Sequence, residues 1–164
     1  AAVRSVLLRA REQGCRRAFV YCNSLSAAVD FAPLEAETGM RIVTPLQVYR
    51  ALAPRHRRLG LIAANAQGLA GIERTLYGAN PSLELLGACL LPVVVDIESG
   101  GPPAEVVERH RLGDLAEWFR ACGVEALVLG CTHFPYFQGT LAERTSLPLI
   151  DPAEEMVRLL TAPT

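Results

Sequence analysis

The stretch ALVLGCTH at residues 126–133 joins an apolar strand to a cysteine and two polar residues, and it is the clearest indication of the fold. The stretch AFVYCNS at residues 18–24 has the same order. Each is followed by a helix's length of sequence and by a short apolar run that ends in proline, at Pro45 and at Pro152. The repeat predicts two similar units, each with a thiol at the end of a strand.

Around these copies, apolar strands alternate with segments of helical periodicity. We expect strands at 17–22, 41–44, 58–64 and 124–129, with one or two more in 83–95. We expect helices at 3–11, from Ser24 or Ser26 to 38, from about 65 to 77, at 103–122, and after residues 133 and 151. This alternation predicts an α/β fold in which parallel sheets carry helices on both faces. Ligands of such sheets bind beyond the carboxyl ends of the strands, where Cys22 and Cys131 are expected.

Charge and composition exclude several classes of partner. The 16 basic and 17 acidic residues give a net charge of −1, so we expect neither a nucleic-acid nor a membrane partner. The dense basic run at 55–58 is interpreted as a solvated turn. The apolar run at 83–95 is interrupted by a charge, a glycine and a proline and is too short to cross a bilayer.

The cysteines point to free thiols. Five cysteines and no secretory leader favour a reducing cytosol over a disulfide framework. No Cys-x-x-Cys occurs and the three histidines are scattered, so no metal site is expected. Three of the cysteines are interpreted as packing residues away from the strand ends: Cys15, Cys89 and Cys122.

The two remaining cysteines suit proton transfer at carbon. A thiol beside a helix amino terminus is favoured as the thiolate. The backbone N–H groups there, with the polar side chains of Asn23, Ser24 and Thr132, can hold a carboxylate. Two such thiols on opposite faces of one carbon, Cys22 and Cys131, would remove a proton from one side and return one from the other.

Other polar residues near these strand ends have more than one interpretation. His133, two residues after the second cysteine, is a proton partner for that thiol or for a substrate amine. Glu98 closes the apolar stretch at 90–97, where it is either a solvated strand end or a residue that orients His133. Asp151 precedes Pro152 and is predicted to cap the last helix.

The motifs resemble those of glutamate racemases. GCTHFP at residues 130–135 is similar to their Gly-Cys-Thr-His-Tyr-Pro signature, and YCNSLSA at 21–27 resembles their Ala-Cys-Asn-Thr-Ala-Ser-Ala signature. The resemblance runs over nearly the whole chain. It implies the aspartate/glutamate racemase fold of two pseudo-symmetric α/β lobes with the active site between them. The division expected is residues 1–44 plus 138–164 for the first lobe and 45–137 for the second.

The resemblance also implies a function. Glutamate would be racemised without a cofactor or metal, with Cys22 and Cys131 as the acid/base pair, to supply D-glutamate for peptidoglycan in the cytoplasm. Substrate contacts would come from Asn23, Ser24, Thr132 and His133, with Glu98 supporting the histidine. The partner implied is the amino acid itself, and assembly as a homodimer is left open.

Departures from the family pattern leave alternatives open. The family begins with a strand, an Asp-Ser-Gly loop and a Pro-Tyr-Gly segment, none of which occurs here, so the first lobe is expected to be incomplete. A Thr-containing loop of the family is replaced by AANAQ at residues 63–67. The alternatives are a racemase of aspartate, of a hydantoin or of a substituted malonate, and a non-catalytic remnant that binds a small carboxylate or a partner protein.

Overall fold

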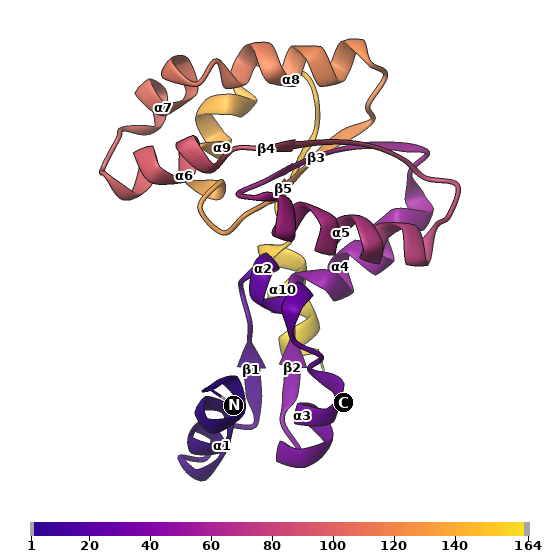
Figure 1. Cartoon of the computed structure of the whole chain (residues 1–164), viewed down its shortest axis with the longest axis vertical. Coiled ribbons are helices and arrows are strands. Elements are labelled where there is room, and N and C mark those ends of the chain that lie inside the picture. The colour runs from indigo at the N-terminus through magenta and orange to yellow at the C-terminus, as the bar shows by residue number, and fades with distance from the viewer. Residues whose placement is uncertain (1, 163–164) are drawn as a thin grey trace.

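The computed structural model describes residues 2–162, which form two α/β lobes, the larger at the top of Figure 1 and the smaller below it. The smaller lobe has a two-stranded sheet, β1-β2, and the larger lobe a four-stranded sheet in the order β4-β3-β5-β6. Every strand pairing in both sheets is parallel. The α/β fold with parallel sheets that the sequence predicts is therefore confirmed.

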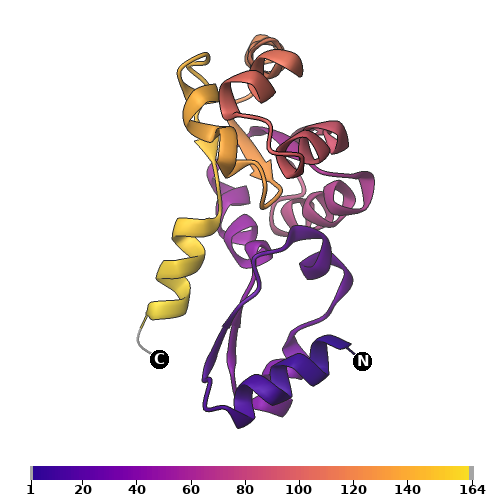
Figure 2. The same ribbon diagram turned by 90° about the vertical axis from the view of Figure 1, so that its left-hand side faces the viewer.

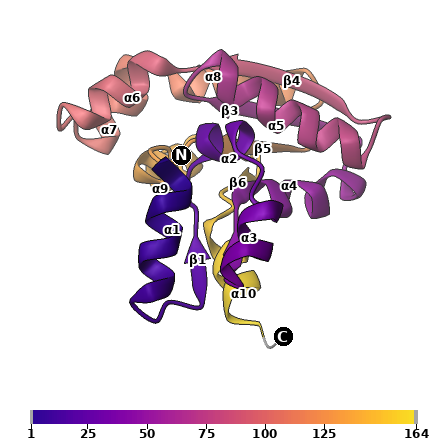
Figure 3. The ribbon, with the colours of Figure 1, turned by 60° about the horizontal axis from the view of Figure 1, so that its bottom comes forward.

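The smaller lobe gathers short elements around a small apolar core. α1 lies along β1, as Figure 3 shows, and its buried Leu7 packs with Met40 and Ile42. The left-handed backbone of Gly39, with φ of 61°, ends α3 and turns the chain into β2. The elements are α1 (Ala2–Glu12), β1 (Arg17–Phe19), α2 (Asn23–Ala28), α3 (Ala32–Thr38), β2 (Arg41–Val43) and α10 (Ala153–Thr161).

The larger lobe is a sheet covered on both faces. Its central strands are continuous apolar runs because helices exclude water from both of their faces. Leu59 and Leu61 pack with Ile72 of α5, while Leu127 and Leu129 belong to the core on the opposite face. The elements are α4 (Pro45–Leu52), η1 (Ala53–Arg55), β3 (Arg58–Ala63), α5 (Ala66–Ala79), β4 (Glu84–Cys89), α6 (Leu91–Glu98), α7 (Pro103–Arg109), α8 (Leu112–Ala121), β5 (Ala126–Gly130), α9 (Pro135–Ala142) and β6 (Leu149–Ile150).

The two sequence repeats adopt matching structures that exchange their last helices. Each repeat forms a parallel strand pair, β1 with β2 and β5 with β6, followed by a helix. α4 follows the smaller sheet but contacts α5 of the larger lobe. α10 follows the larger sheet but lies beside β1 and β2 (Figure 2). Met156 of α10 packs with Val43 and Val48. The two connections between the lobes therefore lie next to the ends of both sheets.

The lobe boundary differs from the sequence-based one near residue 138. β6 pairs with β5, and α9 packs against α7, so both belong to the larger lobe. Of the segment 138–164, the part from α10 joins the smaller lobe, and residues 163–164 lie outside the described residues. The boundary shifts because β6 forms its hydrogen bonds with β5, the neighbouring strand of the larger sheet.

Three elements differ from the expected ones. The run 83–95 forms β4 and then α6, because Pro92 fits the first turn of a helix and Val93 and Val94 face its buried side. The helix expected up to residue 38 is split where Asp30 Oδ1 accepts a hydrogen bond from the Ala32 N–H and starts α3. The helix expected at 103–122 is split at Arg111, whose φ is 51°. Among the helices of residues 2–162, none has the length and apolar character to cross a membrane.

Candidate active site

The first thiol stands where the chain leaves β1 and enters α2. Cys22 is the amino-terminal cap of α2, with extended backbone, and its Sγ accepts a hydrogen bond of 3.5 Å from the Leu25 N–H. Ser26 Oγ donates to the Cys22 carbonyl oxygen at 2.6 Å and fixes this turn. The thiol is half-buried, so a small molecule can reach it.

Asn23 follows Cys22 and is almost fully buried. Its Oδ1 accepts a hydrogen bond of 2.8 Å from the hydroxyl of Tyr49 on α4. Its Nδ2 is buried and has no hydrogen-bond partner. Buried amide donors are nearly always paired, so this one marks a place where another molecule can supply an acceptor.

Ser24 lies where α2 packs on α5. A Cβ atom on Gly68 would lie 3.1 Å from Ser24 Oγ, so glycine makes room for the hydroxyl there. One turn further along, Gly71 meets Ala27 in the same way. These small residues let α2, which carries three of the predicted site residues near its start, rest closely on the larger lobe.

The second thiol stands where the chain leaves β5. A Cβ on Gly130, the last residue of β5, would lie 2.8 Å from the Ile62 carbonyl oxygen, so only glycine fits beside β3. Cys131 follows and is buried. The His133 backbone and the Thr132 side chain both act to lower the pKa of its thiol, against the larger effect of burial. Cys131, Thr132 and His133 therefore act as one local group.

His133 connects this thiol to a carboxylate. Its Nδ1 lies 3.5 Å from Cys131 Sγ, and its Nε2 lies 3.1 Å from Glu98 Oε1. An ionised carboxylate only accepts, so a neutral imidazole that donates to Glu98 from Nε2 has Nδ1 left to accept a hydrogen bond from the thiol. Glu98 ends α6, a helix where the sequence analysis expected a strand, yet it still reaches His133.

The charges around Cys131 act on its protonation. Burial is the largest cause and raises the pKa of the Cys131 thiol above its usual value. The negative charges of Cys22 and Glu98 raise that pKa further, and the hydrogen bonds from His133 and Thr132 lower it. The two thiols therefore share one electrostatic environment: a thiolate at Cys22 favours a proton on Cys131.

Two tyrosines that the sequence analysis did not assign complete the surroundings. Tyr21 donates a hydrogen bond of 2.8 Å to Asp151 Oδ1, and Tyr49 donates to Asn23. Burial is the largest cause that raises the pKa of both phenols, and the charge of Cys131 makes a smaller contribution, which places them near that thiol. Tyr49 could have been singled out from the sequence because its hydroxyl interrupts the apolar face expected for residues 45–52. Asp151 Oδ1 also accepts from the Ala153 N–H at 3.2 Å, as a helix cap does.

The other cysteines do not pack as expected. Cys15 and Cys89 are exposed, and Cys122 is half-buried. Cys89 is also the last residue of β4, at the same sheet edge as Gly130, which the sequence analysis did not foresee. β3 separates the two strands, so Cys89 is not beside Cys131. Within residues 2–162, no three His, Cys, Asp or Glu side chains are grouped as metal ligands.

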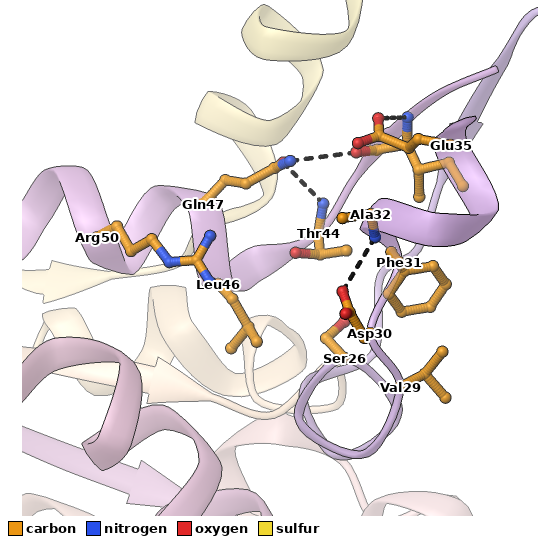
Figure 4. Close-up of a pocket in the computed structure, with 11 residues that line it drawn as sticks. Ser26, Val29, Asp30, Phe31, Ala32, Glu35, Thr44, Leu46, Gln47 and Arg50 are labelled. Carbon is orange, nitrogen blue, oxygen red and sulfur yellow. Dashed lines mark hydrogen bonds between the residues drawn. The ribbon is translucent and has the colours of Figure 1, made fainter. Parts of the chain in front are cut away.

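A separate pocket of about 240 Å³ lies between α3 of the smaller lobe and α4 of the larger lobe (Figure 4). Arg50 and Gln47 stand on one side of it, and Asp30 and Glu35 on the other. Gln47 and Glu35 are held by hydrogen bonds to the backbone of Thr44 and Ile42. None of the predicted site residues lines this pocket, so the thiols and the pocket are distinct places in the fold.

Known proteins resemble this chain in both sequence and fold. The model of the Asp/Glu/Hydantoin racemase family matches residues 1–160. Glutamate racemases of Corynebacterium glutamicum and Thermus thermophilus are each 31% identical over 90% and 92% of this chain. That of Limosilactobacillus reuteri is 28% identical over 90% of it. The chain spans 55–57% of the length of these relatives.

Solved structures agree in fold. The glutamate racemase of Francisella tularensis, in complex with D-glutamate, superposes with a TM-score of 0.75 at 21% identity, covering 96% of this chain and 63% of its own. Allantoin racemase of Klebsiella pneumoniae superposes with a TM-score of 0.61 at 18% identity, with the same coverage of 96% and 63%. The match of the family model over residues 1–160 shows that the chain belongs to the Asp/Glu/Hydantoin racemase family.

Proposed function

We propose that this chain interconverts L-glutamate and D-glutamate without a cofactor, with Cys22 and Cys131 as acid and base on opposite faces of the α-carbon. The observation that carries the proposal is that the charge of Cys22 acts on Cys131, although the two thiols follow matching strands in different lobes. The relatives whose names are glutamate racemase support the choice of substrate.

The reaction needs one thiolate and one thiol at a time. The thiolate takes the α-proton and becomes a thiol, while the electron pair stays on the α-carbon and its carboxylate. The opposite thiol then gives its proton to the other face and becomes the thiolate. A charge on Cys22 that favours a protonated Cys131 supports this division of roles, since each catalytic event exchanges the two protonation states.

The substrate carboxylate would meet donors that the fold already directs to this region. The buried Nδ2 of Asn23 lacks an acceptor, and a carboxylate oxygen would supply it. The hydroxyls of Ser24 and Thr132 would add two more donors. Holding the carboxylate this way stabilises the negative charge that develops when the α-proton leaves.

His133 and Glu98 would act on the Cys131 side. The imidazole accepts the thiol proton at Nδ1, and the resulting cation faces the Glu98 carboxylate at Nε2. His133 and Glu98 together would therefore oppose the rise in the pKa of Cys131 that burial causes, so that this residue can act as the base. No step in this scheme uses a metal or an organic cofactor.

The proposal extends to a cellular role. D-glutamate is a building block of peptidoglycan, and a cytoplasmic racemase would supply it from L-glutamate. Two further candidates, a racemase of aspartate or of a hydantoin and a non-catalytic protein that binds a small carboxylate, are outcomes of the test below. Assembly of two copies stays a prediction.

The test is proton exchange in heavy water, followed by NMR and by chiral analysis of the product. Starting from protiated L-glutamate, a two-base enzyme gives D-glutamate with deuterium at the α-carbon while the remaining L-glutamate stays protiated at early times. Aspartate and a 5-substituted hydantoin are assayed in parallel, and Cys122→Ala serves as a control thiol variant. Exchange with aspartate or the hydantoin alone reassigns the substrate. Saturable binding of D-glutamate without exchange indicates the non-catalytic candidate. The absence of both exchange and binding refutes the proposal.

A further inference from the structure

We infer that Tyr49 is a positioning residue that holds the Asn23 amide so that its N–H group is presented to the substrate carboxylate; this inference rests on the proposed function. The phenol of Tyr49 donates to Asn23 Oδ1 at 2.8 Å, and the Nδ2 of the same amide is the buried donor without a partner. The phenol occupies the accepting end of the amide and leaves the donating end for a ligand.

Tyr49 itself is held in place by the element that carries it. It is fully buried on α4, which begins with a capping box formed by Thr44 and Gln47. α4 contacts both α2 and α5, so the phenol reaches Asn23 from the larger lobe while Asn23 belongs to the smaller one. The hydrogen bond therefore also fixes where α2 starts relative to the larger sheet.

The phenol remains protonated over the working range of the protein. Burial is the largest cause that raises the pKa of Tyr49 well above its ordinary value, and the charge of Asp151 raises it further. A neutral phenol can donate to an amide oxygen, whereas a phenolate cannot. If Tyr49 is replaced by phenylalanine, the amide is free to turn, and its N–H no longer has a fixed direction.

The geometry also indicates the kind of ligand. An amide N–H needs an acceptor, and a carboxylate oxygen makes a charge-assisted hydrogen bond that is stronger than one to a neutral group. The Asn23 amide therefore favours an α-carboxylate over a neutral amide or ester at the same position. Tyr49 would contribute to affinity and selectivity without touching the substrate.

The experiment compares Tyr49→Phe with Tyr21→Phe. Both variants remove one phenol hydroxyl that donates a 2.8 Å hydrogen bond, but Tyr21 donates to Asp151 instead of Asn23. We expect Tyr49→Phe to raise KM and the Kd of D-glutamate roughly tenfold and to change kcat less than twofold, because one oriented hydrogen bond to a charged group is lost. Tyr21→Phe should mainly lower the unfolding temperature, and Tyr77→Phe, which alters an exposed ring with no part in the site, should leave KM within twofold.

A second pair of variants separates positioning from packing. In an Asn23→Ala background, Tyr49→Phe should raise KM no further, since the hydroxyl acts only through the amide. An unchanged KM in Tyr49→Phe, or an equal rise in KM with and without Asn23, overturns the inference while the proposed function stands. A wild-type chain that neither binds nor turns over glutamate overturns both.

The wild-type chain gives a readout that does not depend on any variant folding. The side-chain amide protons of Asn23, assigned by their absence in Asn23→Ala, should shift in NMR spectra when D-glutamate is added to saturation. Saturation is judged from other resonances of the protein. Asn23 amide resonances that stay in place at saturation overturn the inference.

Discussion

Tyr21 donates a 2.8 Å hydrogen bond to Asp151, although 130 positions separate them in the sequence. Tyr21 stands between β1 and α2, and Asp151 stands between β6 and α10. The contact therefore joins the two sequence repeats at the places where each leaves its strand, directly beside Cys22. The contact fixes the two lobes relative to each other, and so helps to set the relative positions of Cys22 and Cys131.

We predict that Tyr21→Phe lowers the free energy of unfolding by about 1–3 kcal/mol, the range for a hydrogen bond to a charged group. Asp151→Ala should cost more, because it also removes the acceptor for the N–H of Ala153, the first residue of α10. Urea denaturation followed by circular dichroism measures both, with Tyr77→Phe as the control on an exposed ring. Equal stability of Tyr21→Phe and the control would show that the contact does not hold the lobes.

A second prediction concerns alkaline pH. The pKa values of Tyr21 and Tyr49 are both raised, chiefly by burial, so the folded state keeps phenol protons that the unfolded chain releases near pH 10. Stability from this source is complete below about pH 10 and falls above it, by up to about 1.4 kcal/mol per pH unit for each group. Lysine would titrate in the same range, but all 16 basic side chains are arginines.

The measurement is urea unfolding at half-unit steps from pH 9 to 11.5. The variant with both Tyr21→Phe and Tyr49→Phe should lose stability with pH less steeply than the wild type, whereas Tyr77→Phe should follow the wild type. Burial also raises the pKa of the Cys131 thiol, and because both proteins retain this thiol, its contribution cancels in the comparison. Parallel curves for the double variant and the wild type would contradict the assignment to these two phenols.

The repeats could be predicted from sequence because their signals are local. A strand, a thiol beyond its end and the helix that follows need only neighbouring residues to be recognised. The run 83–95 misled the sequence analysis because Val93 and Val94 favour strands, whereas Pro92 and burial on one side of α6 decide for a helix. The Tyr49–Asn23 hydrogen bond could not be predicted from the sequence, because it forms only when α4 packs against α2 and α5.

A third prediction concerns the two thiols. Cys22→Ala and Cys131→Ala should each abolish racemisation in both directions, because a proton cannot be removed on one face and delivered on the other with a single group. Each variant should still eliminate a leaving group from the β-carbon of a substrate analogue of the matching configuration, which needs one base only. Chiral chromatography and release of the leaving group measure the two reactions. Racemisation at the wild-type rate by either variant would contradict the two-base mechanism.

A fourth prediction uses the remaining cysteines. Cys15 and Cys89 are exposed and Cys131 is buried, so iodoacetamide should modify the first two well before Cys131. Mass spectrometry of timed samples gives the order. Cys15→Ala, Cys89→Ala and Cys122→Ala should each keep turnover within about twofold of the wild type, since none of these residues contacts the paired thiols. Loss of turnover with an unchanged melting curve would mean that the wrong cysteines have been assigned.

The last prediction concerns His133 and Glu98. His133→Asn removes the imidazole whose Nδ1 lies 3.5 Å from Cys131 Sγ; if this imidazole takes the thiol proton as proposed, kcat should fall by roughly 10²-fold, the lower range for a general acid–base group. Glu98→Gln should cost less, because the amide oxygen still accepts from Nε2. The two enantiomers of glutamate are equal in energy, so kcat/KM must fall by the same factor in both directions.

Isotope effects identify the step. When Cys131 is the impaired base, α-deuterated substrate should show a larger isotope effect in the direction where Cys131 removes the proton than in the reverse direction. His110→Asn is the matched control. His110 follows the last residue of α7, and its Nε2 also lies 3.0 Å from a carboxylate, that of Asp96. It should leave kcat within about twofold. Isotope effects in His133→Asn that rise equally in both directions would show that the histidine does not act on the Cys131 face alone.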